Sequence, residues 1–126
     1  DRDPNIFGDN VIATACSLAE STNAKAIISL SRSGYSAFQL ASHRSKAELF
    51  VVTPNKHLLN QLSLVWGIKM VHYAPFTSTD ETIEGIVAQI VKEGSLKKGD
   101  VYIVTASFPM DKKRKHANML KIGHVE

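Results

Sequence analysis

Residues Ala24–Arg44, AKAIISLSRSGYSAFQLASHR, carry the pattern from which the architecture of this chain can be read. The run Ala26–Leu30 is short, apolar and rich in β-branched residues, which predicts a buried central strand. A hydroxyl-rich turn, Ser31–Ser36, follows it, and beyond this turn apolar residues recur at helical spacing. The stretch therefore predicts a strand, a turn and a helix.

The turn contains Ser31, Arg32, Ser33, Gly34, Tyr35 and Ser36. A strand-to-helix turn points backbone N–H groups and the positive end of the helix dipole at one place, where phosphates bind well. The serines add hydroxyl donors, and Arg32 adds a guanidinium that can form paired hydrogen bonds. The alternative is a structural role, in which Ser33 or Ser36 caps the helix and Gly34 eases the turn.

The rest of the chain alternates strands with helices. Strands are expected at residues 26–30, 48–52, 68–73, 101–105 and 118–125, and helices at 11–19, 37–44, 54–66 and 79–93. Such alternation argues for a parallel sheet covered on both faces. The connection before the last strand is too short for a crossover helix, so that strand should run antiparallel to its neighbour. The expected fold is α/β: a three-layer α/β/α sandwich around a mixed, mostly parallel five-stranded sheet.

Length and composition set further bounds. A chain of 126 residues suits one domain, which we expect at residues 9–126 after an arm or linker at 1–8. No apolar run approaches the ~20 residues that a membrane span needs, so no membrane partner is expected. The lone Cys16 is interpreted as a packing residue and suits a reducing cytoplasm. The net charge of +3 is compatible with anionic ligands.

The connection before the last strand carries four consecutive basic residues, Lys112, Lys113, Arg114 and Lys115. They are interpreted either as a solvated loop tip or as a clamp over a bound phosphate. This connection and the turn Ser31–Ser36 each follow a strand, and open α/β sheets bind ligands at the carboxyl ends of their strands. We expect the two strands to be neighbours, so that the basic run adds charge to the serine turn. Nucleic acid is not an expected partner, because the run is short and has no interleaved aromatic residues.

Residues 30–55, LSRSGYSAFQLASHRSKAELFVVTPN, resemble the corresponding part of the C-terminal domain of pyruvate kinase. That family has a Ser/Thr-x-Ser-Gly-x-Ser loop, a helix, a basic residue and a strand ending in Thr-x-Asn. Here the loop is Ser31–Ser36, the basic residue is Arg44, and the turn is Thr53-Pro54-Asn55. The similarity continues through Trp66-Gly67-Ile68, Leu96–Val101 and Asn118, and it implies the same sandwich with an antiparallel last strand.

The resemblance also implies a function. In many pyruvate kinases this domain is regulatory: a phosphate of a sugar phosphate such as fructose 1,6-bisphosphate sits in the serine loop, and the loop before the last strand folds over it. Ser31, Arg32, Ser33 and Ser36 match the first element closely. In the second, Lys112–Lys115 replace the usual glycines, Ala117 replaces a threonine, and Asn118 is retained. The expected effector is therefore a phosphorylated metabolite: a sugar phosphate, a nucleotide monophosphate or plain phosphate.

The chain is not expected to catalyse a reaction alone. It contains no GxSxG, GxxxxGK[ST] or HExxH motif, and its five histidines lack metal-ligand spacing, so no catalytic residue, metal or cofactor is expected. The resemblance places the chemistry in a separate catalytic barrel, in cis or in trans, and implies a homo-oligomer. Two alternatives stay open. The domain is a structural assembly module, or a stand-alone paralogue of that domain, that has lost the effector; or it is a small hydrolase that uses Ser33 with a distant histidine.

Overall fold

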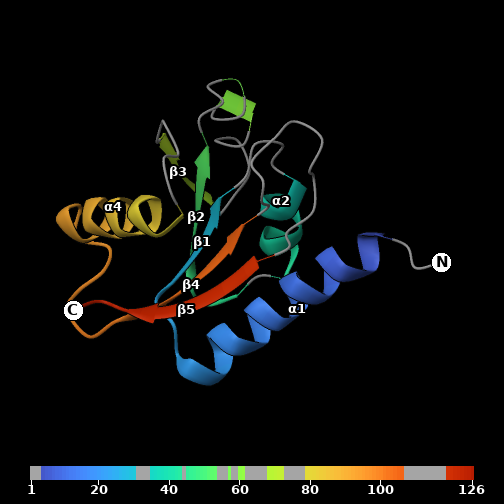
Figure 1. Ribbon diagram of the computed structural model, residues 1–126, viewed down its shortest axis with the longest axis horizontal. Helices are drawn as coiled ribbons and strands as arrows, with labels where there is room; N and C mark the ends of the chain where they lie inside the picture. The colour runs from blue at the N-terminus through green and yellow to red at the C-terminus, as the bar shows by residue number, and fades with distance from the viewer. Residues whose placement is uncertain are drawn as a thin grey trace.

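The computed structural model describes residues 4–30, 35–43, 45–53, 57, 60–61, 68–72, 79–106 and 119–126. Its sheet contains β1 (Ala26–Leu30), β2 (Glu48–Thr53), β3 (Ile68–His72), β4 (Val101–Ala106) and β5 (Met119–His124), in the order β3-β2-β1-β4-β5. The pairings among β1 to β4 are parallel, and β5 runs antiparallel to β4 (Figure 1). The α/β class and the antiparallel last strand are therefore confirmed.

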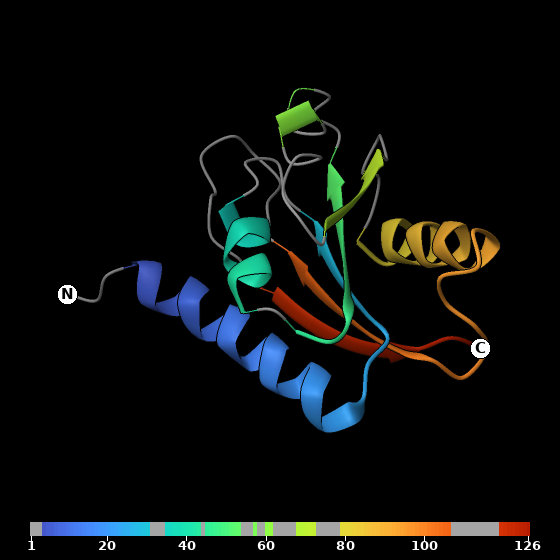
Figure 2. The ribbon, with the colours of Figure 1, turned by 180° about the vertical axis from the view of Figure 1, so that it is seen from behind.

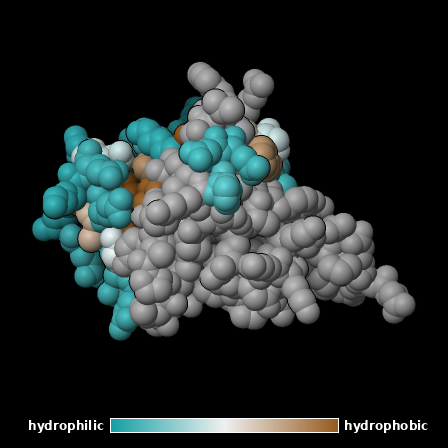
Figure 3. Space-filling view, turned by 90° about the horizontal axis from the view of Figure 1, so that it is seen from above, coloured by the Kyte–Doolittle hydropathy of each residue, from teal (hydrophilic) through white to brown (hydrophobic). Residues whose placement is uncertain are grey.

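Helices cover both faces of the sheet, which gives three layers. Helices α1 (Pro4–Thr22) and α2 (Tyr35–Ser42) lie on one face, and α4 (Thr79–Lys92) lies on the other, as two opposite views show (Figures 1 and 2). Helix α4 buries its apolar stripe in one hydrophobic cluster, and α1 and α2 contribute to a second cluster across the sheet. The opposite, outward face of α4 is hydrophilic (Figure 3). The amphipathic patterns in the sequence thus correspond to real burial.

The central strands are buried on both faces, and the strands at the edges are not. All five residues of β1 are buried, as are the last five residues of β2 and of β4. The edge strand β5 is only partly buried. At the other edge, Lys69 on β3 pairs with Glu48 at 3.2 Å and lies 5.8 Å from the centre of the Phe50 ring. Continuous apolar runs in the sequence therefore mark the central strands, as expected for a parallel sheet.

Three expected helices differ from, or extend beyond, what the structure describes. Helix α2 spans Tyr35–Ser42, whereas the sequence predicted a helix over 37–44, so Tyr35 and Ser36 belong to the helix and not to the predicted turn. Helix α1 begins at Pro4, whereas the sequence predicted an arm or linker at 1–8 and a helix over 11–19. Proline is favoured at the first helical position, because its φ is already helical and its missing N–H needs no partner there. The helix expected between β2 and β3 is described only at His57, Asn60 and Gln61, which are helical.

Candidate functional site

The two loops that the sequence singles out lie largely outside the described residues. These are the residues Ser31, Arg32, Ser33 and Gly34 of the serine turn, and Lys112, Lys113, Arg114, Lys115 and Asn118 of the basic connection. Tyr35 and Ser36 are the first residues of α2. What the structure does describe is the ends of the elements that carry these loops.

Leu30 and Ala106, the residues from which the two loops depart, are paired neighbours. They are the last residues of β1 and β4, and they lie opposite each other in a parallel register. Each is about 1% exposed, so both strand ends are fixed in the core. Neighbouring strands lie about 4.8 Å apart, so the chain leaves the sheet at two adjacent points of the same edge. The expectation that these two strands are neighbours is confirmed.

Helix α2, which begins at Tyr35 within the predicted turn Ser31–Ser36, is anchored on the sheet. Its Ala37 and Leu40 are buried in the cluster that also contains Ile27 of β1 and Val51 of β2. The amino end of α2, at Tyr35, follows the carboxyl end of β1 after four intervening residues. The amino end of a helix therefore follows the carboxyl end of a central strand closely along the chain, and such a helix end can attract an anion.

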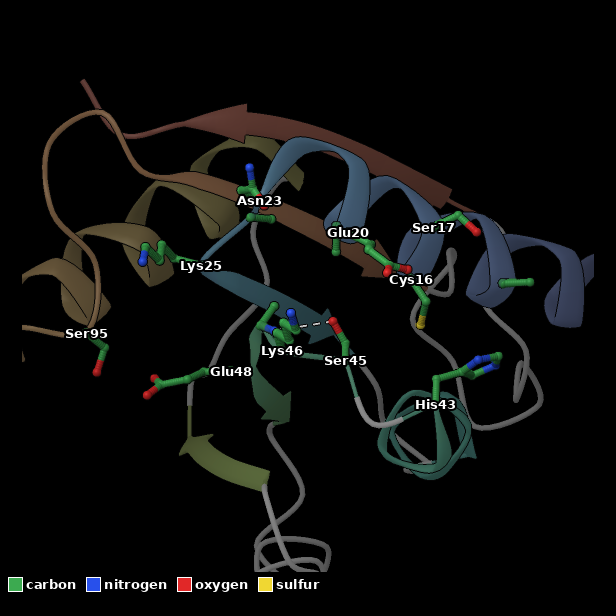
Figure 4. Close-up of a pocket in the computed structure, with 14 residues that line it drawn as sticks. Cys16, Ser17, Glu20, Asn23, Lys25, His43, Ser45, Lys46, Glu48 and Ser95 are labelled. Atoms are coloured by element: carbon green, nitrogen blue, oxygen red, sulfur yellow. Dashed lines mark hydrogen bonds between the residues drawn. The ribbon is translucent and has the colours of Figure 1, made fainter.

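At the other end of the strands, where β1 and β2 begin, the structure has a groove that the sequence did not predict. It has a volume of about 810 Å³ and lies between the carboxyl-terminal half of α1 and the connection from α2 to β2. Cys16, Ser17 and Glu20 line it from α1, and His43, Ser45, Lys46 and Glu48 line it from the other side (Figure 4). Sequence patterns could not reveal it, because no local signal brings the start of β2 beside α1.

The chemistry of this groove is mixed. Lysines and glutamates both line it, so no single charge prevails. Burial raises the pKa of the Cys16 thiol, which makes the thiolate scarcer at neutral pH and agrees with a packing role. The Ser45 hydroxyl accepts a hydrogen bond from the Ala47 backbone N–H at 3.3 Å and stabilises the turn before β2. Among the described residues, no group of three or more His, Cys, Asp or Glu side chains could hold a metal ion.

Comparison with known proteins decides the family. A family model described as "Pyruvate kinase, alpha/beta domain" matches residues 9–123. The chain belongs to the pyruvate kinase alpha/beta domain family. It is 35% identical over 121 residues to a pyruvate kinase of Staphylococcus haemolyticus, covering 96% of this chain and 20% of that protein. It is 32% identical over 118 residues to a pyruvate kinase of Clostridium acetobutylicum, covering 94% of this chain and 25% of that protein.

Solved structures agree with the fold of this pyruvate kinase domain. A pyruvate kinase from Cryptosporidium parvum superposes with a TM-score of 0.84 at 19% identity, covering 95% of this chain and 23% of that chain. A structure of the C. parvum enzyme in complex with ADP gives a TM-score of 0.85 at 18% identity, covering 100% of this chain and 25% of that chain. The chain thus spans about a fifth to a quarter of these relatives. In the part that the structure describes, no helix is both long and apolar enough to cross a membrane.

Proposed function

We propose that this domain is a regulatory ligand-binding domain that binds a phosphorylated metabolite at Ser31–Ser36. In this proposal Arg32 and the serine hydroxyls hold the phosphate, and Lys112–Lys115 with Asn118 close the site from the basic connection. The observation that carries the proposal is the register of β1 and β4. Because Leu30 pairs with Ala106, both connections begin at neighbouring points on the edge where open α/β sheets bind ligands.

The chemistry of the two connections suits a phosphate. The last two residues of Ser31–Ser36 open α2, whose amino end contributes a partial positive charge. Arg32 and the four consecutive basic residues at 112–115 supply charged donors, which form stronger hydrogen bonds than neutral ones. A sugar phosphate, a nucleotide monophosphate and inorganic phosphate share the group that these donors recognise.

We further propose that the domain forms homo-oligomers and acts with a pyruvate kinase catalytic barrel, in cis or in trans, in the cytoplasm. The support for assembly is the edge strand β5, which pairs with β4 on one side and whose Ile122 is 47% exposed. The described exposed positions of α1 carry one charge, that of Glu20, and the others are Asn10, Ala13, Thr14, Ser17 and Ser21. Low charge is typical of the centre of protein interfaces. Phosphoryl transfer itself would belong to the barrel.

Calorimetric titration tests ligand binding. The chain is titrated with fructose 1,6-bisphosphate, glucose 6-phosphate, ribose 5-phosphate, AMP and inorganic phosphate, and the titrations are repeated on Arg32→Ala/Ser33→Ala. Hydrogen bonds to charged groups contribute about 1.5–3 kcal/mol each, so the loss of two donors should weaken binding on the order of a hundredfold or more. The matched control is Ser42→Ala/Lys46→Ala, which removes one hydroxyl at the carboxyl end of α2 and one cation just beyond it. The control should bind as the unaltered chain does.

A second candidate is a purely structural assembly module. Its support is the divergence of the basic connection, where Lys112–Lys115 and Ala117 depart from the pattern of the family that the chain resembles. Saturable binding that the Arg32→Ala/Ser33→Ala variant loses would favour the regulatory domain. Absence of binding by every compound, together with a concentration-dependent dimer in sedimentation velocity, would favour the assembly module.

A further inference from the structure

Two buried hydroxyls lie side by side in the middle of the sheet. Ser29 on β1 and Thr105 on β4 are paired in the parallel register, one residue before the ends of their strands. Side chains alternate between the faces of a strand, so both share the face of Ile27 and Ile103, which belong to the cluster under α1 and α2. The two hydroxyls therefore project from adjacent strands into the same layer of the core.

Neither hydroxyl has a protein partner among the described residues. Ser29 and Thr105 are 0% exposed, and the Ser29 Oγ and Thr105 Oγ1 atoms are buried without a hydrogen bond. They also do not bond to each other, although Ser and Thr often do so across neighbouring strands. Buried polar groups without partners are rare in folded proteins, because each loses its bonds to water and gains nothing in return. Two at adjacent positions require a common explanation.

We propose that Ser29 and Thr105 form a binding site for one internal water molecule, which bridges β1 and β4 beneath α1 and α2. A buried water typically makes two to four hydrogen bonds to groups that would otherwise have no partner. Each hydroxyl can donate one hydrogen bond and accept others, so a single water can satisfy both. The bridge ties together the penultimate residues of the two strands that lead into residues 31–34 and 107–118.

This inference is independent of phosphate binding, since it concerns the core and not the loops. Thr82 on α4 provides the contrast. It is also buried with no hydrogen bond to the described residues, but it lies in a helix on the other face of the sheet and has no hydroxyl beside it in a strand register. Thr82→Val therefore serves as a control for the loss of one buried hydroxyl.

A double-mutant cycle on Ser29→Ala and Thr105→Val tests the bridge by chemical denaturation of the chain. If a water links the hydroxyls, each single variant either leaves the water with one hydrogen bond fewer or releases it and leaves the other hydroxyl without a partner. Each should raise the unfolding equilibrium constant roughly five- to tenfold. The double variant releases the water and leaves two apolar groups, so its constant should lie within about threefold of the unaltered chain. Ser29→Ala and Thr82→Val should combine additively.

Two results would overturn the proposal. If each single variant lowers the unfolding constant and the two effects add, then the hydroxyls are isolated and carry no water. The second result is the absence of water-to-amide nuclear Overhauser effects at the amides near Ser29 and Thr105. A bridging water must produce such long-lived contacts there. These contacts should persist in Thr82→Val and disappear in the double variant. Coupled variants without such contacts would mean a direct bond between the hydroxyls, and the water would be rejected.

Discussion

At Gly123, on the edge strand β5, even the methyl group of alanine should cause a measurable loss of stability. It pairs with Tyr102 across the antiparallel β4–β5 ladder. A Cβ atom on Gly123 would lie 2.6 Å from both Cζ and the hydroxyl oxygen of Tyr102. The Tyr102 ring therefore covers the glycine, an arrangement that shields a weak position in an edge strand. In Gly123→Ala the ring or the strand must move.

The size of the loss follows from three terms. Alanine in place of glycine reduces the freedom of the unfolded chain, which favours folding by about 0.4–1 kcal/mol. Forcing extra atoms into packed structure costs about 1–3 kcal/mol. Swinging the Tyr102 ring fully into water would expose roughly 150–250 Å² and cost about 4–6 kcal/mol at 25 cal/mol per Å², so a local shift is cheaper. Gly123→Ala should thus destabilise the domain by about 1–2 kcal/mol, or lower its Tm by roughly 3–10 °C.

A cycle with Tyr102→Val separates this contact from other effects. Once the ring is gone, the added methyl group has space, so adding Gly123→Ala to Tyr102→Val should be neutral or stabilising by up to about 1 kcal/mol. Thermal and urea unfolding of the four proteins give the coupling energy. A Gly123→Ala variant as stable as the unaltered chain would refute the close packing of ring and glycine. So would a loss of the same size with and without the ring.

Three further predictions concern other parts of the fold. Ile103→Ala should cost about 2–5 kcal/mol in urea unfolding, because Ile103 is fully buried, whereas Ile122→Ala, its half-exposed cross-strand partner, should cost well under half as much. Equal losses would contradict the burial of this face. Gly99→Ala should destabilise the domain by about 1 kcal/mol although its Cβ has open space, because φ at Gly99 is +89°. An unchanged Tm would argue against that backbone conformation. Because burial raises the pKa of the Cys16 thiol, a disulfide reagent should label the folded chain more slowly than a small free thiol at neutral pH, and urea should remove the difference. Equally fast labelling would contradict that direction.

The strands of the sheet could be predicted from the sequence, but the start of the first helix could not. The strands at 26–30 and 101–105 were predictable because two-faced burial requires uninterrupted apolar runs. The start of α1 at Pro4 was not predicted, because Gly8 and polar neighbours interrupt the helical pattern that begins clearly only at Val11. The domain boundary at residue 9 stays a prediction.

Features that depend on neighbours distant in sequence could not be read from the chain. Ser29 and Thr105 each look like a tolerated hydroxyl in an apolar strand, and only the register of β1 with β4 puts them together. The groove between α1 and the connection to β2 also requires the packed structure. By contrast, the adjacency of the strands that precede both candidate loops was expected and is confirmed. The roles of Ser31–Ser36 and of Lys112–Lys115 with Asn118 stay predictions, because they depend on side chains outside the described residues.

The strand order also suggests how ligand binding would be linked to assembly. Strand β4 pairs with β1 along one side and with the edge strand β5 along the other. A ligand that spans the ends of β1 and β4 would therefore contact β4, the strand that pairs directly with β5. Coupling requires the ligand to prefer one assembly state, and a shift in β4 that favours ligand binding must also change the edge that β5 presents. The dimerisation constant should then change with fructose 1,6-bisphosphate, or whichever compound binds in calorimetry. A ligand that binds tightly yet leaves that constant unchanged would separate the two functions.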